Sequence, residues 1–220
     1  MNIIIIDATF EAISVLASGN EGIYSSSFFP NTRQRGKNLT IFLENAAKEA
    51  GFLLKETELI ALPEGPGGFT GLRLGYAATK AISLVSNAII LAIPTLTIFD
   101  FSQTYWNGNL LAIIDAKRNS FYAQFFSFHK VQTEIYDATA TQIISNIDIS
   151  KPCLVVGIGV ASFKKSLMGC EHNLQFLELP QTAFPQYILQ FVLNERSNCK
   201  ELKDDGSPLY VRKSDAEMQK

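Results

Sequence analysis

One glycine-rich run constrains the fold of this chain more than any other feature of its sequence. Five glycines and a proline fall within eleven residues, Gly65-Pro66-Gly67-Gly68-Phe69-Thr70-Gly71-Leu72-Arg73-Leu74-Gly75. The apolar residues 59–62 before the run predict a short buried strand, and residues 76–87 after it predict a helix. A glycine turn between a strand and a helix can bind an anion with its free N–H groups, or it can let another segment pack closely. The sequence leaves both alternatives open.

The familiar loops that bind phosphate or carry a nucleophile are absent from the sequence. No glycine is followed after four residues by Gly-Lys-Ser or Gly-Lys-Thr, as a P-loop requires. The dinucleotide fingerprint needs glycine at its sixth position, where this chain has Thr70 in the first run and Ser162 in a second run that begins at Gly157. No serine stands between glycines as in a nucleophile elbow. The glycine run is therefore not one of the standard enzyme loops.

Two apolar runs, each ending in an Asp-Ala pair, indicate an internal repeat. The first run ends at Asp7 and the second at Asp115, about half the chain apart. Segments with strand-forming residues follow both runs: 12–17 and 22–29 in the first half, and 121–128 in the second. A buried strand, an Asp-Ala turn and a returning strand in each half predict an α/β fold that is duplicated within one chain.

The repeat predicts two small lobes. We expect an N-terminal lobe over residues 1–100, which carries the glycine run, and a C-terminal lobe over residues 101–212. With 47% hydrophobic residues, the chain has enough apolar side chains for packed cores. Residues 213–220 have almost no apolar content, so we expect a flexible tail there.

Residues 37–50 carry the clearest amphipathic helix of the sequence. The apolar residues of its predicted buried face follow the helical period: Leu39, Phe42, Leu43, Ala46, Ala47 and Ala50. The helix after the glycine run is apolar almost all round, which is typical of a helix that is buried on more than one side. Its apolar side chains could be buried within the lobe or against a partner protein.

Composition and charge narrow the classes of function. A net charge of −2 argues against strong binding to nucleic acid by this chain alone, because such binding needs a concentrated basic face. Cys153, Cys170 and Cys199 are odd in number and lack a CxxC spacing, which favours reduced thiols. No signal peptide begins the sequence, and no apolar run is long enough to cross a membrane. We therefore expect a soluble, cytoplasmic protein that makes no membrane contact.

The residue types needed for a metal centre are scarce. The two histidines, His129 and His172, are too far apart in sequence for a helical metal pair, so we expect no metal site. Asp7 and Asp115 are better candidates for chemistry. In a duplicated fold the two carboxylates could face one cleft and hold a metal-bound phosphate. Alternatively, each could cap its own turn by accepting a backbone N–H two residues on.

The glycine run resembles the signature of the bacterial TsaB family, whose members are also called YeaZ. The fourth position of that signature is usually serine, where this chain has Gly68. Further matches span most of the chain: Ile5-Ile6-Asp7-Ala8-Thr9, Ile114-Asp115-Ala116-Lys117-Arg118, Val156-Gly157-Ile158-Gly159 and Pro208-Leu209-Tyr210-Val211-Arg212.

The resemblance implies the duplicated, ribonuclease-H-like fold that actin, the heat-shock chaperone ATPases and the sugar kinases share. TsaB-like proteins take part in making N6-threonylcarbamoyladenosine in tRNA, beside the anticodon. They are paralogues of the catalytic subunit TsaD that lack its metal-binding histidines, and they dimerise with TsaD and work with the ATPase TsaE. The resemblance therefore implies a non-catalytic scaffold subunit that reaches tRNA only through the complex.

The resemblance also implies where the partner binds, because the partner surface of the family uses its first two helices. The implied contact residues are Leu39, Phe42, Leu43, Leu72, Arg73, Tyr76 and Thr79. The same surface could pair two copies of the isolated chain. No cofactor is implied, and ATP binding, if any, would be weak or at the partner interface.

Three departures from the family pattern weaken the case for an intact nucleotide site. The usual Asp-Thr-Ser near the N-terminus is Asp7-Ala8-Thr9, a usual His-Ser pair is replaced by Lys37-Asn38, and Gly68 replaces serine. Asp7 and Asp115 would then be remnants of such a site. The alternative is a small ATP-dependent kinase or phosphotransferase that uses both aspartates and the glycine turns. A peptidase is a third possibility, against which the missing metal histidines argue.

Overall fold

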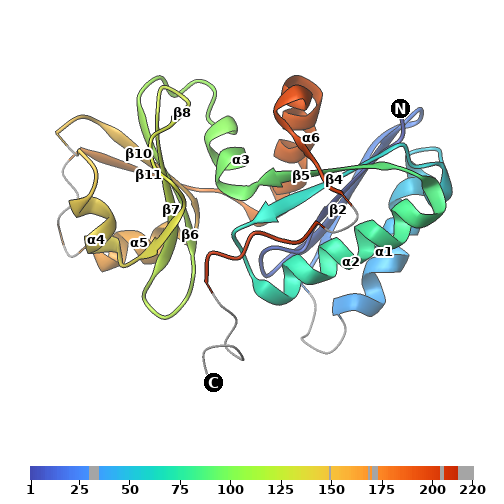
Figure 1. Ribbon diagram of the computed structural model, residues 1–220, viewed down its shortest axis with the longest axis horizontal. Helices are drawn as coiled ribbons and strands as arrows, with labels where there is room; N and C mark the ends of the chain where they lie inside the picture. Colours follow the sequence, from blue (N-terminus) through green and yellow to red (C-terminus); the bar gives the residue numbers. More distant parts are fainter. Residues whose placement is uncertain (30–34, 149, 168, 170–172, 204–205, 213–220) are drawn as a thin grey trace. The chain divides into compact units, whose positions relative to one another are not determined.

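The computed structural model describes residues 1–29, 35–148, 150–167, 169, 173–203 and 206–212. The chain divides into two compact units (Figure 1). The first comprises Met1–Pro94 with Gln181–Leu209, and the second comprises Thr95–Pro180 with Tyr210–Lys220. The predicted tail, residues 213–220, lies outside the described residues.

The first unit is built on a mixed sheet with the strand order β12-β5-β4-β1-β2-β3. Its strands are β1 (Ile3–Asp7), β2 (Ile13–Gly19), β3 (Gly22–Phe28), β4 (Leu59–Gly65), β5 (Ile89–Pro94) and β12 (Lys200–Glu201). Strand β1 lies between antiparallel β2 and parallel β4, with Ile4 opposite both Ala17 and Ile60. Every residue of β1 is buried, as expected for a central strand that helices cover on both faces.

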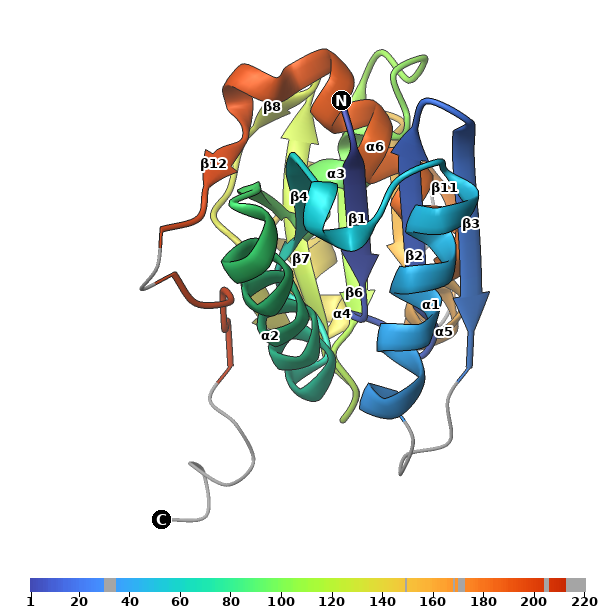
Figure 2. The same cartoon turned by 90° about the vertical axis from the view of Figure 1, so that its right-hand side faces the viewer.

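Three helices cover this sheet: α1 (Arg35–Glu49), α2 (Phe69–Ser86) and α6 (Phe184–Glu195). Helices α1 and α2 lie side by side on one face (Figure 2). There Leu39 and Leu43 of α1 pack in one core cluster with Ile4 and Ile6 of β1. Helix α6 packs against β1, β2 and β4, on the face to which the alternate residues of β1 point. Short 3-10 helices complete the unit: η1 (Leu54–Glu56), η2 (Gln181–Ala183) and η3 (Arg196–Asn198).

The second unit repeats this arrangement with the strand order β11-β10-β6-β7-β8, and β9 also pairs with β7. Its strands are β6 (Asn109–Asp115), β7 (Phe121–Ser127), β8 (Lys130–Val131), β9 (Tyr136–Ala138), β10 (Cys153–Ile158) and β11 (Leu174–Glu178). Its helices are α3 (Thr95–Phe101), α4 (Ala140–Ser145) and α5 (Val160–Ser166). Strand β6 lies between antiparallel β7 and parallel β10, as β1 does between β2 and β4. The duplicated α/β fold predicted from the two Asp-Ala pairs is confirmed.

The boundaries of the units differ from the predicted lobes 1–100 and 101–212. Helix α3 follows the last parallel strand of the first sheet in sequence, yet it packs against β6, β7 and β10 of the second. Helix α6 follows β11 but packs on the first sheet, and β12 pairs with β5. The break therefore falls after Pro94, and residues 181–209 belong to the first unit. Sequence order does not reveal this exchange, because each helix has an apolar face that either sheet could bury.

Helix α2 begins at Phe69, within the glycine run, rather than at Tyr76 as predicted. Glycine lowers helix stability by about 1 kcal/mol relative to alanine, which is why the run indicates a turn by propensity alone. Packing of the first turns of the helix against the rest of the unit overrides that preference. The polar segment that follows α6 forms η3 and the short strand β12.

We expect Phe184→Ala to destabilise the protein by about 3–5 kcal/mol, because it empties a buried aromatic site between α6 and the first sheet. Phe184 is 1% exposed, and its ring meets that of Phe10 edge to face at 5.2 Å. Urea denaturation measures the loss. Leu193→Ala, on the same helix at 59% exposure, is the control and should change stability by no more than about 0.5 kcal/mol. Equal losses in both variants would contradict the assignment of α6 to this core.

Candidate functional site

The glycine run packs against the Ala8–Thr9 turn that follows β1. Gly68 caps the N-terminus of α2, and its N–H donates to the Thr9 carbonyl oxygen at 2.9 Å. A Cβ atom on Gly67 would overlap Thr9 Cγ2, and a Cβ on Gly71 would overlap the Ala8 carbonyl oxygen. The two backbones approach more closely than side chains would allow. Of the two alternatives for the glycine run, this geometry supports close packing.

Asp7 ends β1 and is buried beside the same turn. Its Oδ1 accepts the Thr9 N–H at 2.9 Å, and its Oδ2 has no hydrogen-bond partner within the described part of the chain. Burial raises the pKa of Asp7 to about 7, against the lowering effect of the hydrogen bonds from Thr9. The carboxyl group therefore caps its own turn and keeps its proton up to nearly neutral pH.

Asp115 repeats this arrangement at the end of β6. Its Oδ1 accepts the Lys117 N–H at 2.7 Å, and its Oδ2 lies 3.9 Å from Lys117 Nζ. Both aspartates thus cap their turns by accepting the N–H two residues on, which is one of the two predicted roles. Asp7 and Asp115 belong to different units, so their proposed convergence on one cleft stays a prediction.

The second glycine turn, between β10 and α5, is filled by the side chain of Glu178. Its Oε1 accepts the Gly159 N–H at 2.6 Å, and its Oε2 accepts the Ala161 N–H at 3.0 Å. Gly159 has a left-handed φ of 93°, and a Cβ there would lie 2.5 Å from Asp115 Cβ. No sequence motif marks Glu178. Its place follows from the parallel pairing of β10 with β11, which brings Glu178 opposite Gly157 at the end of the strand.

Most of the residues predicted to contact a partner lie inside the first unit. The buried ones are Leu39, Leu43, Leu72, Tyr76 and Thr79. Leu39 and Leu43 belong to the cluster under α1 and α2, and Tyr76 packs in a second cluster with Leu62 and Ala92. Side chains with exposures of 4% or less have no surface to offer, so these five positions are corrected to core positions. The periodicity that suggested a partner face instead marks the face of each helix that packs on the sheet.

The other two predicted contact residues keep some accessible surface. Phe42 is half-buried, and its ring stacks on that of Phe28 at a centroid distance of 4.2 Å. Arg73 is exposed, with its guanidinium 4.0 Å from the centre of the Phe69 ring. Only Arg73 therefore lies on the outer side of its helix.

From Ala77 onward, the exposed side chains of α2 are apolar. Leu84 is 84% exposed and Val85 is 65% exposed. Ala77 and Ala81 are exposed one and two turns after Arg73. Such a stripe of exposed apolar side chains marks a candidate interaction surface. We call Ala77, Ala81, Leu84 and Val85 the outer face of α2.

Side chains suited to metal or thiol chemistry do not gather in the described residues. No group of three or more His, Cys, Asp or Glu side chains there could hold a metal ion. His129 Nδ1 lies 3.1 Å from Asp100 Oδ2 on α3, whereas His172 and Cys170 lie outside the described residues. Cys153 and Cys199 are free thiols, and burial raises the pKa of Cys153 to about 12. Among the described helices, none has both the length and the hydropathy to cross a membrane.

Comparison with protein families and curated proteins gives consistent matches. Residues 28–173 match the family described as TsaD, tRNA N6-adenosine threonylcarbamoyltransferase. The tRNA threonylcarbamoyladenosine biosynthesis protein TsaB of Escherichia coli K12 is 29% identical over 126 residues, 56% of this chain and 53% of the relative. TsaB of Buchnera aphidicola subsp. Schizaphis graminum is 25% identical over 209 residues, 89% of this chain and 94% of the relative. The match spans about half of the first relative and nearly all of the second.

Solved structures share the fold. YeaZ from Pseudomonas aeruginosa superposes with a TM-score of 0.70 at 19% identity, covering 95% of this chain and 99% of the other. Another solved structure, described as an uncharacterized protein with similarity to peptidase YeaZ from P. aeruginosa, gives a TM-score of 0.72 at 19% identity, covering 96% of this chain and 99% of the other. A polyphosphate/ATP glucomannokinase from Arthrobacter sp. strain KM gives 0.50 at 7% identity over 88% and 99%. The expected duplicated actin-like fold is confirmed.

We expect Gly71→Ala to destabilise the protein by more than about 3 kcal/mol, because the added methyl group overlaps a backbone carbonyl that cannot move aside. Gly75→Ala is the matched control, since a Cβ there meets nothing within 4 Å. The control should be neutral or up to about 1 kcal/mol more stable, because alanine favours the helix. Thermal denaturation compares the two. Equal stability of the two variants would mean that the glycine run does not depend on close packing.

We expect the native protein to lose stability as the pH rises, and the Asp7→Asn variant not to show this loss. The folded carboxyl group keeps its proton up to about pH 7, whereas the unfolded one loses it near 3.8. The folded state binds more protons between these values, so stability falls from about pH 4 to about pH 7 and then levels off. The asparagine variant should be more stable by roughly 2–4 kcal/mol at about pH 8. Urea denaturation across this range checks it, and an unchanged pH profile in the variant would contradict it.

Proposed function

Because the chain belongs to the TsaB/YeaZ branch of the TsaD family, we propose that it is a non-catalytic subunit of the cytoplasmic machinery that makes N6-threonylcarbamoyladenosine in tRNA. It pairs with a TsaD-like catalytic subunit and acts together with a TsaE-like ATPase. A net charge of −2 favours tRNA contacts made mainly by the other subunits. The proposal rests on the relatives, and on one structural observation that favours a scaffold over an enzyme.

That observation is that amides in both glycine turns are hydrogen-bonded within the chain itself. The Gly68 amide is bonded to the Thr9 carbonyl oxygen, and the Gly159 and Ala161 amides are bonded to the Glu178 carboxylate. A kinase of this fold would use such amides for phosphate groups and ionised carboxylates for a metal. The bonded amides of both turns and the raised pKa of Asp7 therefore favour a scaffold over the alternative of a small ATP-dependent phosphotransferase.

The outer face of α2 supports the pairing. Four apolar side chains stand exposed on it, and from Ala77 to Val85 no charged side chain interrupts them on the exposed side. Lys80, on the flank of this helix, directs its Nζ to the Gly206 carbonyl oxygen at 3.0 Å. Two alanines one turn apart allow a helix of the partner to approach closely, and the leucine and valine provide apolar area to bury. The same face could pair two copies of the isolated chain.

We expect Ala81→Glu to weaken pairing with the TsaD-like subunit by at least about 30-fold, because an unpaired charge buried at an interface costs about 2 kcal/mol or more. Calorimetric titration of the two purified subunits measures the affinity. Gln190→Glu adds the same charge at an exposed site of α6, across the sheet from α2, and should leave the affinity unchanged. If both variants bind as the native chain does, the outer face of α2 is not the partner surface.

The function itself is tested by product formation on unmodified tRNA. The catalytic subunit and the ATPase from the same organism are assayed with and without this chain, and the modified nucleoside is measured by mass spectrometry. We expect product to form only when this chain is present. Gln190→Glu should support as much product as the native chain does, whereas Ala81→Glu should support almost none. Product that forms equally well without the chain would refute the accessory role. Saturable ATP binding and turnover by the isolated chain would favour the phosphotransferase.

A further inference from the structure

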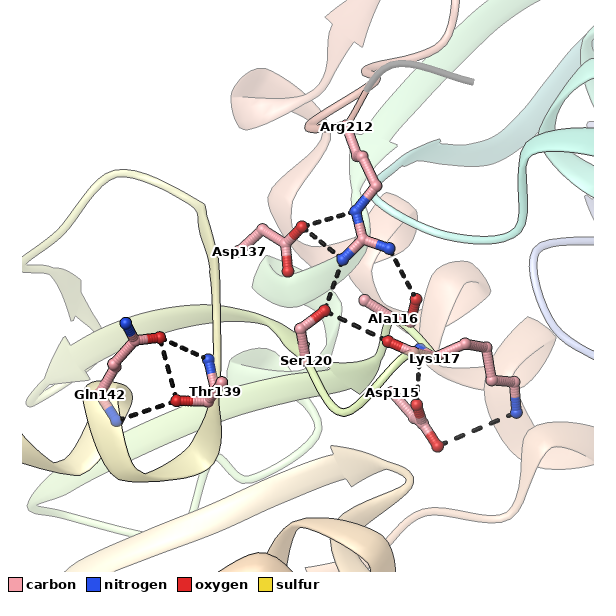
Figure 3. A network of polar contacts seen from close by, with 8 residues as sticks. All are labelled: Asp115, Ala116, Lys117, Ser120, Asp137, Thr139, Gln142 and Arg212. Carbon is pink, nitrogen blue, oxygen red and sulfur yellow. Dashed lines mark hydrogen bonds and ion pairs between the residues drawn. The ribbon is translucent and has the colours of Figure 1, made fainter. Parts of the chain in front are cut away.

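The end of the described chain makes a dense set of polar contacts that the proposed function does not use. Arg212 donates through Nε to Asp137 Oδ2 at 2.7 Å, and its Nη2 lies 2.6 Å from the same oxygen (Figure 3). Its Nη1 donates to the Ala116 carbonyl oxygen at 3.2 Å, and Nη2 also donates to Ser120 Oγ. The guanidinium lies 5.9 Å from the centre of the Tyr122 ring. All three nitrogens of Arg212 therefore serve a single turn and the strand beside it.

That turn, residues 116–120, connects β6 to β7 and has an unusual backbone. Lys117, Arg118 and Asn119 have φ values of 61°, 55° and 59°, so three successive residues are left-handed. Side chains with a Cβ disfavour this conformation, and glycine is the residue that usually supplies it. No glycine lies in the turn, so other contacts must hold it in this form.

The contacts that hold the turn converge on its two ends. Asp115 Oδ1 accepts the Lys117 N–H, and Ala116 and Ser120 are joined by a backbone hydrogen bond of 3.0 Å. Ser120 Oγ donates to the Lys117 carbonyl oxygen at 3.3 Å and accepts from Arg212. Arg212 is distant from the turn in sequence and touches both of its ends, through Ala116 and Ser120 (Figure 3).

The same terminal segment also makes backbone contacts within the first unit. The Leu209 N–H donates to the Glu64 carbonyl oxygen at 2.7 Å, at the end of β4 where the glycine run begins. Gly65 has a φ of 119°, and a Cβ there would lie 2.5 Å from the Leu209 carbonyl oxygen. Within a few residues, the chain contributes a backbone contact to one unit and a guanidinium to the other.

We propose that Leu209–Arg212 is a C-terminal clasp, in which Arg212 is the positioning residue that keeps the 116–120 turn left-handed. The turn is then complete only when the last described residues of the chain are in place. This inference is independent of the proposed function, because it concerns the local order of the turn and not the complex.

The test compares Arg212→Ala with the conservative Arg212→Lys and with Asp137→Asn, and measures hydrogen exchange of individual amides by NMR. We expect Arg212→Ala to speed exchange at Ala116 and Ser120 by at least about 10-fold while Val155 in β10 keeps its native rate. Arg212→Lys should behave like the alanine variant, because a single ammonium group cannot reproduce a planar fork of donors. Asp137→Asn keeps the shape of the site and should give an intermediate rate, so the test remains available if Arg212→Ala fails to fold.

Two truncations give a matched pair. A chain that ends at Arg212 should exchange at the turn like the native protein, whereas a chain that ends at Leu209 should match Arg212→Ala. Native exchange at Ala116 and Ser120 in Arg212→Ala would overturn the clasp. Equal acceleration at Val155 would overturn it too, because Arg212 would then support the whole unit and not the turn. Formation of the modified nucleoside with these variants is a separate readout, and it can fail without affecting the exchange result.

Discussion

The structure depends on the close approach of two glycine turns to the turns that end the central strands. In the first unit Gly67 and Gly71 lie against Thr9 and Ala8, where an added Cβ would overlap the Thr9 side chain or the Ala8 carbonyl oxygen. In the second unit Gly159 lies against Asp115 in the same way. These contacts fix where α2 and α5 begin, and therefore how both helices lie on their sheets. An interior packed at crystal-like density leaves no room for a substituent at such points.

The same approach determines which chemistry the turns can support. An amide that is bonded to the neighbouring carbonyl or carboxylate is not free to bind a phosphate group. The first turn uses Thr9 as its internal acceptor, and the second uses Glu178, an anion built into the chain. A fold that other proteins use to handle phosphates is in this way compatible with a structural role. The outer face of α2 in the first unit is apolar and exposed.

Much of the fold was predictable from local patterns, and much of the site was not. Two isoleucine-rich or leucine-rich runs ending in Asp-Ala indicated the duplication, because a buried central strand needs apolar residues on both faces. The capping roles of Asp7 and Asp115 follow from a preference that acts over two residues. By contrast, the apolar positions of α1 and α2 showed only that something covers them. Leu39 and Tyr76 meet the chain's own sheet and core, which periodicity cannot distinguish from a partner.

The sequence by itself determined the central strands, the two aspartate turns, the glycine run and the family resemblance, since each rests on residues close together in the chain. The tertiary structure alone decided the contacts over long separations. It packed α3 on the second sheet and α6 on the first. It also placed Glu178 on the second glycine turn and Arg212 beside Asp137. Such pairings leave little local signature, because an apolar helix face or a charged side chain is compatible with many partners. Only the simultaneous burial of all the apolar faces and the pairing of the buried polar groups select one of them.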